Sequence, residues 1–378
     1  MRPGMEIVAA VLGSSALIAG CATPLRATPP SPSAAATAEA LTITGVGVEP
    51  KTLDLSPPRN GHAVVVRSQL NRAATVSLDI VDATGRVVRQ LRADAQTDRP
   101  QMRWDGLTEA GKPVPPGVYR YVLHARAMDG AQATYDPSAA TGGEELEPRD
   151  FTFDRATGRL RWLMPRAGRA RLRVGIEGFP HLRTLLDWEP MEAGWQQLAW
   201  DGLDASGLIR AIDHPHLMVK LSAYVLPDNT IIVRGSPVDA LPSEPPVTYP
   251  PEYAADRAYL HARHPRQGCH EARLSIQFPE ETRYDPQHHP RLQGTVPVRV
   301  MLDARDASFL VNERFEVSLY EDLNFLFEEE ESLNPFTFLW DTTHLTPGAH
   351  LLTVNVLGYD DHYGVVTQPV MIEDAAKP

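Results

Sequence analysis

The chain has 378 residues, which is too long for one β-sandwich and fits about three domains with linkers. Its formal net charge of -12 argues against a nucleic-acid-binding role, because binding to phosphates depends on clustered positive charge. Thirty-four prolines are many for a compact enzyme and are typical of linkers and of β-modules with protected edges.

A short apolar segment opens the chain. Residues 7–20 are 14 uncharged, largely apolar residues, fewer than the roughly 20 that a transmembrane helix needs and typical of a signal-peptide core. The segment ends in Ile18-Ala19-Gly20-Cys21, which resembles the lipobox of bacterial lipoproteins. The resemblance implies that residues 1–20 are a removed signal peptide and that Cys21 carries the lipid. The alternative is an ordinary signal peptide followed by an incidental cysteine.

Residues 21–40 are rich in Pro, Ser, Thr and Ala and contain almost no large apolar residue. This composition predicts a flexible tether between the lipid and the first domain. Ala22 follows the cysteine, and by analogy with the sorting rule of the lipoprotein family this favours the outer membrane. No apolar run after residue 20 approaches the roughly 18–20 residues that span a bilayer, so we expect the lipid to be the chain's only membrane contact.

The first domain is expected at 41–135 and has the pattern of a β-sandwich. Residues 75–80 alternate between apolar and polar side chains, which predicts a strand with one buried face. Trp104 falls on the buried face of a later strand, Asp105 can hydrogen-bond the backbone just ahead of it, and Gly106 permits a positive φ where the strand ends. Short strands separated by Gly and Pro turns predict an all-β sandwich.

The same tripeptide returns 96 residues later as Trp200-Asp201-Gly202. The offset also relates the alternating apolar positions upstream, and it maps Leu78 onto Val174. A register that is kept over about forty positions indicates a duplicated domain. We place this second domain at 149–236.

Several parts of the first domain resemble a known family. They are the strand-turn-strand at 80–89, the Trp-Asp-Gly tripeptide, residues 111–115 and the Gly-Val-Tyr-Arg-Tyr run at 117–121. Together they resemble the Ig-like (fibronectin-III-like) module of the flagellar hook-capping protein. This resemblance implies a scaffolding or docking role and brings no catalytic residues. The second copy departs from it, because His214-Pro215-His216-Leu217 replaces the Pro-Gly-Val-Tyr turn.

The β pattern breaks in a Pro/His-rich connector at 237–294, in which a short helix at 252–264 and a strand at 272–278 are expected. Imidazole and thiolate are the natural ligands of zinc and copper. The candidate metal ligands in this connector are His261, His264, Cys269 and His270. Two interpretations stay open: a metal or haem-ligand site, or a solvated loop whose histidines bind nothing.

A third domain is expected at 295–374, where the apolar and polar alternation returns. Trp340-Asp341 is followed by two threonines and then by a Pro-Gly turn. These residues resemble the bacterial Ig-like modules that occur in tandem on surface proteins, and the resemblance implies the fold only. The whole chain is therefore expected to be all-β, with tandem Ig/FnIII-like β-sandwiches joined by Pro-rich linkers after a lipoprotein signal peptide.

No catalytic constellation stands out, since the sequence has no Gly-x-Ser-x-Gly elbow, no phosphate-binding glycine-rich loop and no His-Glu-x-x-His. The leading hypothesis is a non-catalytic, lipid-anchored envelope protein that acts as a scaffold or docking module for other envelope or surface proteins. It requires no cofactor. The runner-up is a metal- or redox-linked accessory protein that uses the His/Cys connector, either for copper or zinc or beside a cytochrome. The accessory region of a carbohydrate-processing enzyme is disfavoured because no catalytic domain is attached.

Overall fold

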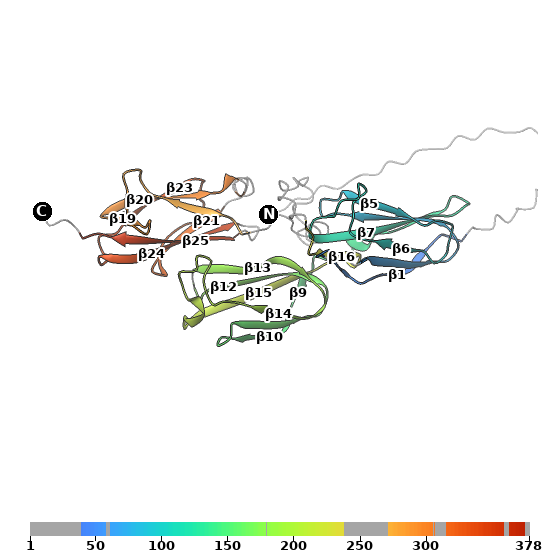
Figure 1. The fold of residues 1–378 in the computed structure, drawn as a ribbon, viewed down its shortest axis with the longest axis horizontal. Coiled ribbons are helices and arrows are strands. Elements are labelled where there is room, and N and C mark those ends of the chain that lie inside the picture. The colour runs from blue at the N-terminus through green and yellow to red at the C-terminus, as the bar shows by residue number, and fades with distance from the viewer. Residues whose placement is uncertain are drawn as a thin grey trace, which may run out of the picture. The chain divides into compact units, whose positions relative to one another are not determined.

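The computed structural model describes residues 39–57, 61–178, 180–237, 271–304, 306, 315–358 and 363–374. These residues form three β-sandwiches, which confirms the all-β, Ig/FnIII-like fold class (Figure 1). Among them there is no helix long and apolar enough to cross a membrane. The predicted signal peptide, the lipidation site Cys21 and nearly all of the predicted tether lie outside the described residues.

Eight consecutive strands and one later strand build the first sandwich. They are β1 (Ile43–Glu49), β2 (Thr52–Asp54), β3 (Val64–Leu70), β4 (Thr75–Val81), β5 (Val87–Arg92), β6 (Gln101–Trp104), β7 (Gly117–Arg126), β8 (Gln132–Tyr135) and β16 (Thr230–Arg234). One sheet has the order β1-β3-β6 and the other the order β2-β16-β7-β4-β5, with β8 paired to β7. The alternation predicted in β4 is confirmed, because Val76, Leu78 and Ile80 are buried in the core.

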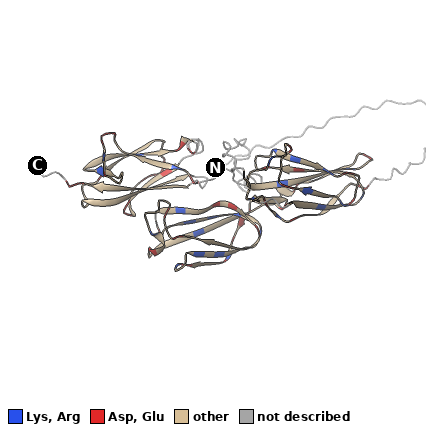
Figure 2. Ribbon diagram, viewed as in Figure 1, with Lys and Arg blue, Asp and Glu red and all other residues tan. Residues whose placement is uncertain are grey.

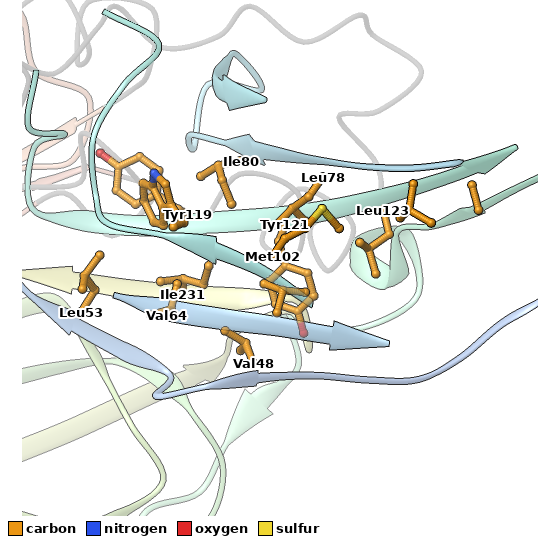
Figure 3. Packing of buried hydrophobic residues seen from close by; sticks show 14 of the residues in the cluster. Val48, Leu53, Val64, Leu78, Ile80, Met102, Tyr119, Tyr121, Leu123 and Ile231 are labelled. Atoms are coloured by element: carbon orange, nitrogen blue, oxygen red, sulfur yellow. The ribbon is translucent and has the colours of Figure 1, made fainter. Parts of the chain in front are cut away.

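The position of β16 corrects the sequence-based boundary of the second domain. The sequence places residues 230–234 at the end of the domain expected at 149–236, but in the structure they complete a sheet of the first sandwich. Strand β16 runs parallel to β2 and antiparallel to β7. Figure 3 shows Ile231 packed among core residues of the first sandwich, including Leu53 and Val64. The repeat pattern marks this segment as a strand but does not say which sheet receives it.

The second sandwich lies in the sequence between β8 and β16. Its elements are β9 (Glu145–Leu146), β10 (Arg149–Asp154), β11 (Arg159–Met164), β12 (Gly168–Ile176), β13 (His181–Met191), β14 (Gly194–Ala199), the 3-10 helix η2 (Ala211–Asp213) and β15 (Leu217–Val225). One sheet has the order β10-β11-β14 and the other the order β13-β12-β15-β9. The two-residue strand β9 precedes the expected start of the domain and pairs with β15.

The second sandwich is therefore inserted into the first. The chain leaves after β8 through the 3-10 helix η1 (Pro137–Ala139) and returns at β16. The buried side-chain amide of Asn229, in the returning segment, holds the two connecting segments together. Its Nδ2 donates to Oδ1 of Asp136 in the outgoing segment at 3.2 Å and to the carbonyl of Tyr121 at 2.9 Å. Two chain segments link these sandwiches, and rotation about a single linker is excluded.

The third sandwich begins earlier than the sequence indicates. Its strands are β17 (Leu274–Gln277), β18 (Arg283–Tyr284), β19 (Pro290–Leu292), β20 (Thr295–Leu302), β21 (Phe315–Glu321), β22 (Asn324–Glu329), β23 (Phe336–Asp341), β24 (Gly348–Gly358) and β25 (Tyr363–Ile372). The sheet orders are β17-β20-β23 and β18-β19-β25-β24-β21-β22. Strands β17 to β19 fall in the expected connector at 237–294, but they pair with β20 and β25, so they belong to the domain expected at 295–374.

Candidate functional site

The Trp-Asp-Gly repeats adopt one hydrogen-bonded turn in both sandwiches. The indole Nε1 of Trp104 donates to the carbonyl of Leu107 at 3.0 Å, and Nε1 of Trp200 donates to the carbonyl of Leu203 at 2.9 Å. Each aspartate accepts from the backbone N–H two residues ahead, at 3.2 Å for Asp105 and 3.0 Å for its counterpart. Both tryptophans are buried, and each belongs to the hydrophobic core of its own sandwich.

The glycines of the two repeats have no room for a side chain. Gly106 has φ +78°, and a Cβ at this position would lie 2.7 Å from Cδ2 of Leu55. Gly202 has φ +83°, and a Cβ there would lie 2.5 Å from Cγ2 of Ile212. The positive φ and the close packing both select glycine.

The third Trp-Asp pair uses a different partner for its indole. Trp340 is fully buried, and its Nε1 donates to Oε2 of Glu321 at 2.9 Å. The backbone N–H of Thr343 donates to Oδ1 of Asp341 at 3.0 Å, and this bond lowers the pKa of Asp341 below its ordinary value. His344 donates to the other oxygen of the same glutamate at 2.8 Å.

The candidate metal ligands His261, His264, Cys269 and His270, and the predicted helix at 252–264, lie outside the described residues. Two other histidines of the expected connector are described. His289 pairs with Asp285 at 3.0 Å, and the ring of His288 stacks on Tyr284 with centroids 4.9 Å apart. Within the described ranges, no group of three or more His, Cys, Asp or Glu side chains is placed to hold a metal ion.

The feature that sequence reasoning missed lies on the outer face of β12. The apolar residues of this strand face the core, and the residues between them are the arginines Arg169, Arg171 and Arg173. The last two are buried as well, so this strand is covered on both faces. Lys and Arg mark several strands of the second sandwich in Figure 2.

The buried arginines form a ladder with aromatic rings. Trp188 of β13 packs against Tyr224 of β15 with centroids 5.0 Å apart. Cζ of Arg171 lies 4.5 Å from the centroid of Trp188 and 5.4 Å from that of Tyr363, and Cζ of Arg173 lies 3.4 Å from the centroid of Tyr363. Tyr363 belongs to β25 of the third sandwich. These five residues are called the arginine–aromatic ladder below. Each cation–π contact contributes about 0.5–2 kcal/mol, with the larger values in desolvated sites.

A backbone irregularity accompanies the ladder. Trp188 has φ +54°, which is uncommon for a residue with a bulky side chain. The pairing of β12 with β13 shifts register between Ala170 and Leu172. Such an irregularity changes the direction in which a side chain leaves its strand. Here the side chain of Trp188 lies against Arg171 on the outer face of β12.

A second set of contacts joins β13 to the third sandwich beside the ladder. The backbone N–H of His181 donates to Oδ1 of Asn355 at 2.8 Å, and Nδ2 of Asn355 donates back to the carbonyl of His181 at 2.9 Å. The imidazole of His181 meets the ring of Tyr363 edge-on at 5.6 Å, and its Nε2 lies 3.6 Å from Oε1 of Glu271. The second and third sandwiches are therefore held by hydrogen bonds as well as by the ladder.

These contacts border a cavity of about 320 Å³. Its walls come from β12, the start of β13 and β15 on one side and from β21, β24 and β25 on the other. The ionisable residues on the walls include Arg173, Lys220, His181 and Glu316. Tyr320 also lines the cavity, and burial raises its pKa to about 12.

Residues 56–129 match the FlgD Ig-like domain family. The match contains the first Trp-Asp-Gly turn and confirms the resemblance for most of the first sandwich. It covers well under half of the chain, so the similarity concerns this module alone. No curated protein is similar enough in sequence to count as a relative.

Several solved structures align weakly with most of the chain. The fibronectin(III)-like modules of Clostridium thermocellum CbhA share 7% identity over 87% of this chain and 94% of that chain, with a TM-score of 0.19. A structure from a 1.5-MDa bacterial ice-binding adhesin shares 10% identity over 88% of this chain and 98% of that chain, also with a TM-score of 0.19. A tetra-tandem repeat from the extending region of a large adhesion protein shares 13% identity over 88% and 74%, with a TM-score of 0.18. Scores this low carry no argument about function, and the fold assignment rests on the sheets themselves.

Proposed function

We propose that this chain is a non-catalytic, lipid-anchored scaffold of the bacterial cell envelope that docks other envelope or surface proteins. The observation that carries the proposal concerns the two joints, that is, the places where successive sandwiches meet. At both joints, side-chain contacts hold the sandwiches together in addition to the covalent chain. A scaffold has to hold its binding faces in fixed register, and modules that bend freely about single linkers do not do so.

The joint between the first and second sandwiches is reinforced by the insertion. Beside the two chain crossings, Nη2 of Arg234 on β16 donates to the carbonyl of Pro190 on β13 at 2.8 Å. Nη2 of Arg166 also lies 3.3 Å from Oδ1 of Asp228 in the returning segment. The joint between the second and third sandwiches is reinforced by the arginine–aromatic ladder. Both joints use buried or paired arginines, which suit planar stacking and bidentate contacts better than lysines do.

An exposed face of the second sandwich supplies a candidate docking surface. On the sheet β10-β11-β14, Trp195 is 50% exposed and Cζ of Arg161 lies 3.9 Å from its ring centroid. Phe151 on β10 is exposed on the same sheet. Aromatic residues and arginine are enriched at protein–protein interfaces. We call Arg161 and Trp195 the aromatic face.

Photo-crosslinking in intact cells tests the docking role. A photoreactive residue at Gln197, which is exposed on β14 beside Trp195, should give an adduct with a protein of defined mass. The adduct should disappear in the Trp195→Ala variant, whose fold is expected to be unchanged. A photoreactive residue at Gln132 on β8 of the first sandwich is the matched control. If the Trp195→Ala variant loses any adducts formed from Gln132 as well as the adduct formed from Gln197, the variant has unfolded. A Gln197 adduct that survives Trp195→Ala, or the lack of any adduct at Gln197, contradicts docking at this face.

The proposed anchor is tested separately. The chain should incorporate a palmitate analogue and partition into detergent, and the Cys21→Ser variant should do neither. An unlabelled, fully soluble wild-type product contradicts the lipid anchor and leaves the docking result unaffected.

A further inference from the structure

The cavity beside the ladder is lined by a buried cation that forms no ion pair with the described residues. Arg173 is only 6% exposed and lines the cavity. Its Nη1 is buried and has no hydrogen-bond acceptor, and within the described residues it forms no ion pair. Stacking on Tyr363 covers one face of the guanidinium but leaves its in-plane N–H groups to be satisfied. A buried cation in this state is costly unless an acceptor is present.

A second cation faces the same space. Arg173 on β12 and Lys220 on β15 are direct partners in the antiparallel pair, so their side chains leave the same face of the sheet. Like charges directly opposite one another are destabilising. Lys220 also lines the cavity, and no carboxylate of the described residues lies within ion-pair distance of its ammonium. An anion bound between the two side chains would remove both penalties.

The remaining walls define the kind of anion. Glu316 lines the cavity and accepts a hydrogen bond from Ser318 at 3.0 Å, and its charge disfavours a doubly charged ligand. Apolar side chains line much of the rest, among them Ile176, Met218 and Leu357. The volume lies at the lower end of the range for small-molecule sites. We propose that this cavity binds a small organic monocarboxylate, with its carboxylate between Arg173 and Lys220 and its apolar part against the apolar walls.

Arginine is well suited to this ligand, because the planar guanidinium can give a carboxylate two parallel N–H bonds. The site goes beyond the scaffold role, since it assigns a ligand to the joint between the second and third sandwiches. Both sandwiches supply walls, so ligand binding should stabilise the joint by mass action.

Titration of the full chain in detergent with benzoate tests the proposal. Benzamide is the neutral control of the same shape. Benzoate should bind saturably in calorimetry, at least about tenfold more tightly than benzamide, which is the expected effect of one well-placed charge pair. Lys220→Gln and Arg173→Gln should each weaken benzoate binding by about fivefold or more, and Glu316→Gln should strengthen it. Arg159→Gln, an exposed change on β11, should leave it unchanged.

The exposed position of Lys220 keeps the test valid even if the buried Arg173→Gln variant does not fold. Three results would each overturn the proposal: no saturable binding of benzoate, equal binding of benzoate and benzamide, or benzoate binding that Lys220→Gln leaves unchanged. An effect of Arg159→Gln as large as that of Lys220→Gln would show non-specific attraction to surface charge and would overturn it as well.

Discussion

Cζ of Arg173 lies 3.4 Å from the centroid of the Tyr363 ring, although the two residues are 190 positions apart in the sequence. One belongs to the second sandwich and the other to the last strand of the third. With Arg171 between Trp188 and the same tyrosine, this contact makes the joint a packed interface with its own buried cations. The joint is thus a packed contact between two sandwiches, and its contribution to their stability can be measured.

The buried repeat tryptophans are the first test. Trp104→Ala and Trp200→Ala should each cost about 3–5 kcal/mol of unfolding free energy in their own sandwich, because each change removes a large buried side chain and leaves a cavity. Trp195→Ala is the control, since this tryptophan is half exposed and its loss should cost about 0.5 kcal/mol or less. These values are measured by denaturant unfolding, with hydrogen exchange used to detect the unfolding of each sandwich. Equal effects of the buried and exposed changes would contradict the core assignment.

The glycine of the first repeat is the second test. Gly106→Ala combines a positive φ with a Cβ 2.7 Å from Leu55, whereas Gly111→Ala has a similar φ of +73° and open space around the added carbon. The left-handed conformation alone should cost about 1–2 kcal/mol, and overpacking should add about 1–3 kcal/mol at Gly106 only. Chemical denaturation of the two variants measures the difference. Equal losses would show that backbone strain, and not packing against Leu55, selects glycine.

The stability of the third sandwich should depend on pH through two histidines. The hydrogen bond from His344 to Glu321 raises the pKa of this imidazole. Burial acts to lower the pKa of His350, but its bonds to Asp322 and to the carbonyl of Thr346 outweigh burial and raise that pKa overall. Folding therefore favours the protonated forms. Their contribution is fully present below the unfolded value near 6.5 and is lost as the pH rises through the raised folded values.

Hydrogen exchange in β21 and β24 should consequently be slower at about pH 6 than at about pH 8, after correction for the intrinsic rate. His344 is more than half exposed, so solvent screens its pair and the effect should stay under about 1 kcal/mol. His344→Gln should reduce the pH dependence, and combining it with His350→Gln should abolish it. A stability that rises with pH over this window would contradict the assignment.

The His/Cys connector remains a prediction. If His261, His264, Cys269 and His270 bind a metal, Zn²⁺ or Cu⁺ should protect the Cys269 thiol from alkylation, and affinity should fall as the pH drops through about 6.5. Metal content and thiol reactivity measured on the untagged chain decide this. Unchanged reactivity, and no binding tighter than about micromolar, would exclude the metal-linked function.

Much of the fold could be predicted from local sequence. The alternation around Leu78 and the repeat of Trp104 as Trp200 depend on strand period and turn chemistry, which are local. The sheet to which β16 belongs could not be predicted, because the sequence around Ile231 is compatible with a core strand in either sandwich. Residues 274–292 show the same limit. The sequence predicts the strand at 272–278 but places it in the connector, because β17 and β19 pair with strands that are distant in the sequence.

The candidate site was missed for a related reason. Arginines at 169, 171 and 173 alternate with apolar residues and look like the solvated face of an ordinary strand. What buries them is Tyr363, together with a register shift that brings Trp188 to the same face. The local sequence indicates this site only through three arginines in succession on one strand face. The aromatic residues that pack against them are distant in the sequence.

Coupling across the ladder tests the central claim most directly. Tyr363→Ala should accelerate hydrogen exchange in β12 and β15 of the second sandwich as well as in β25, because it removes the ring that Arg171 and Arg173 stack on. Tyr284→Ala, at an exposed tyrosine of the third sandwich, is the matched control and should leave the second sandwich unchanged. If Tyr363→Ala affects only the third sandwich, the two are independent modules and the reinforced scaffold is contradicted.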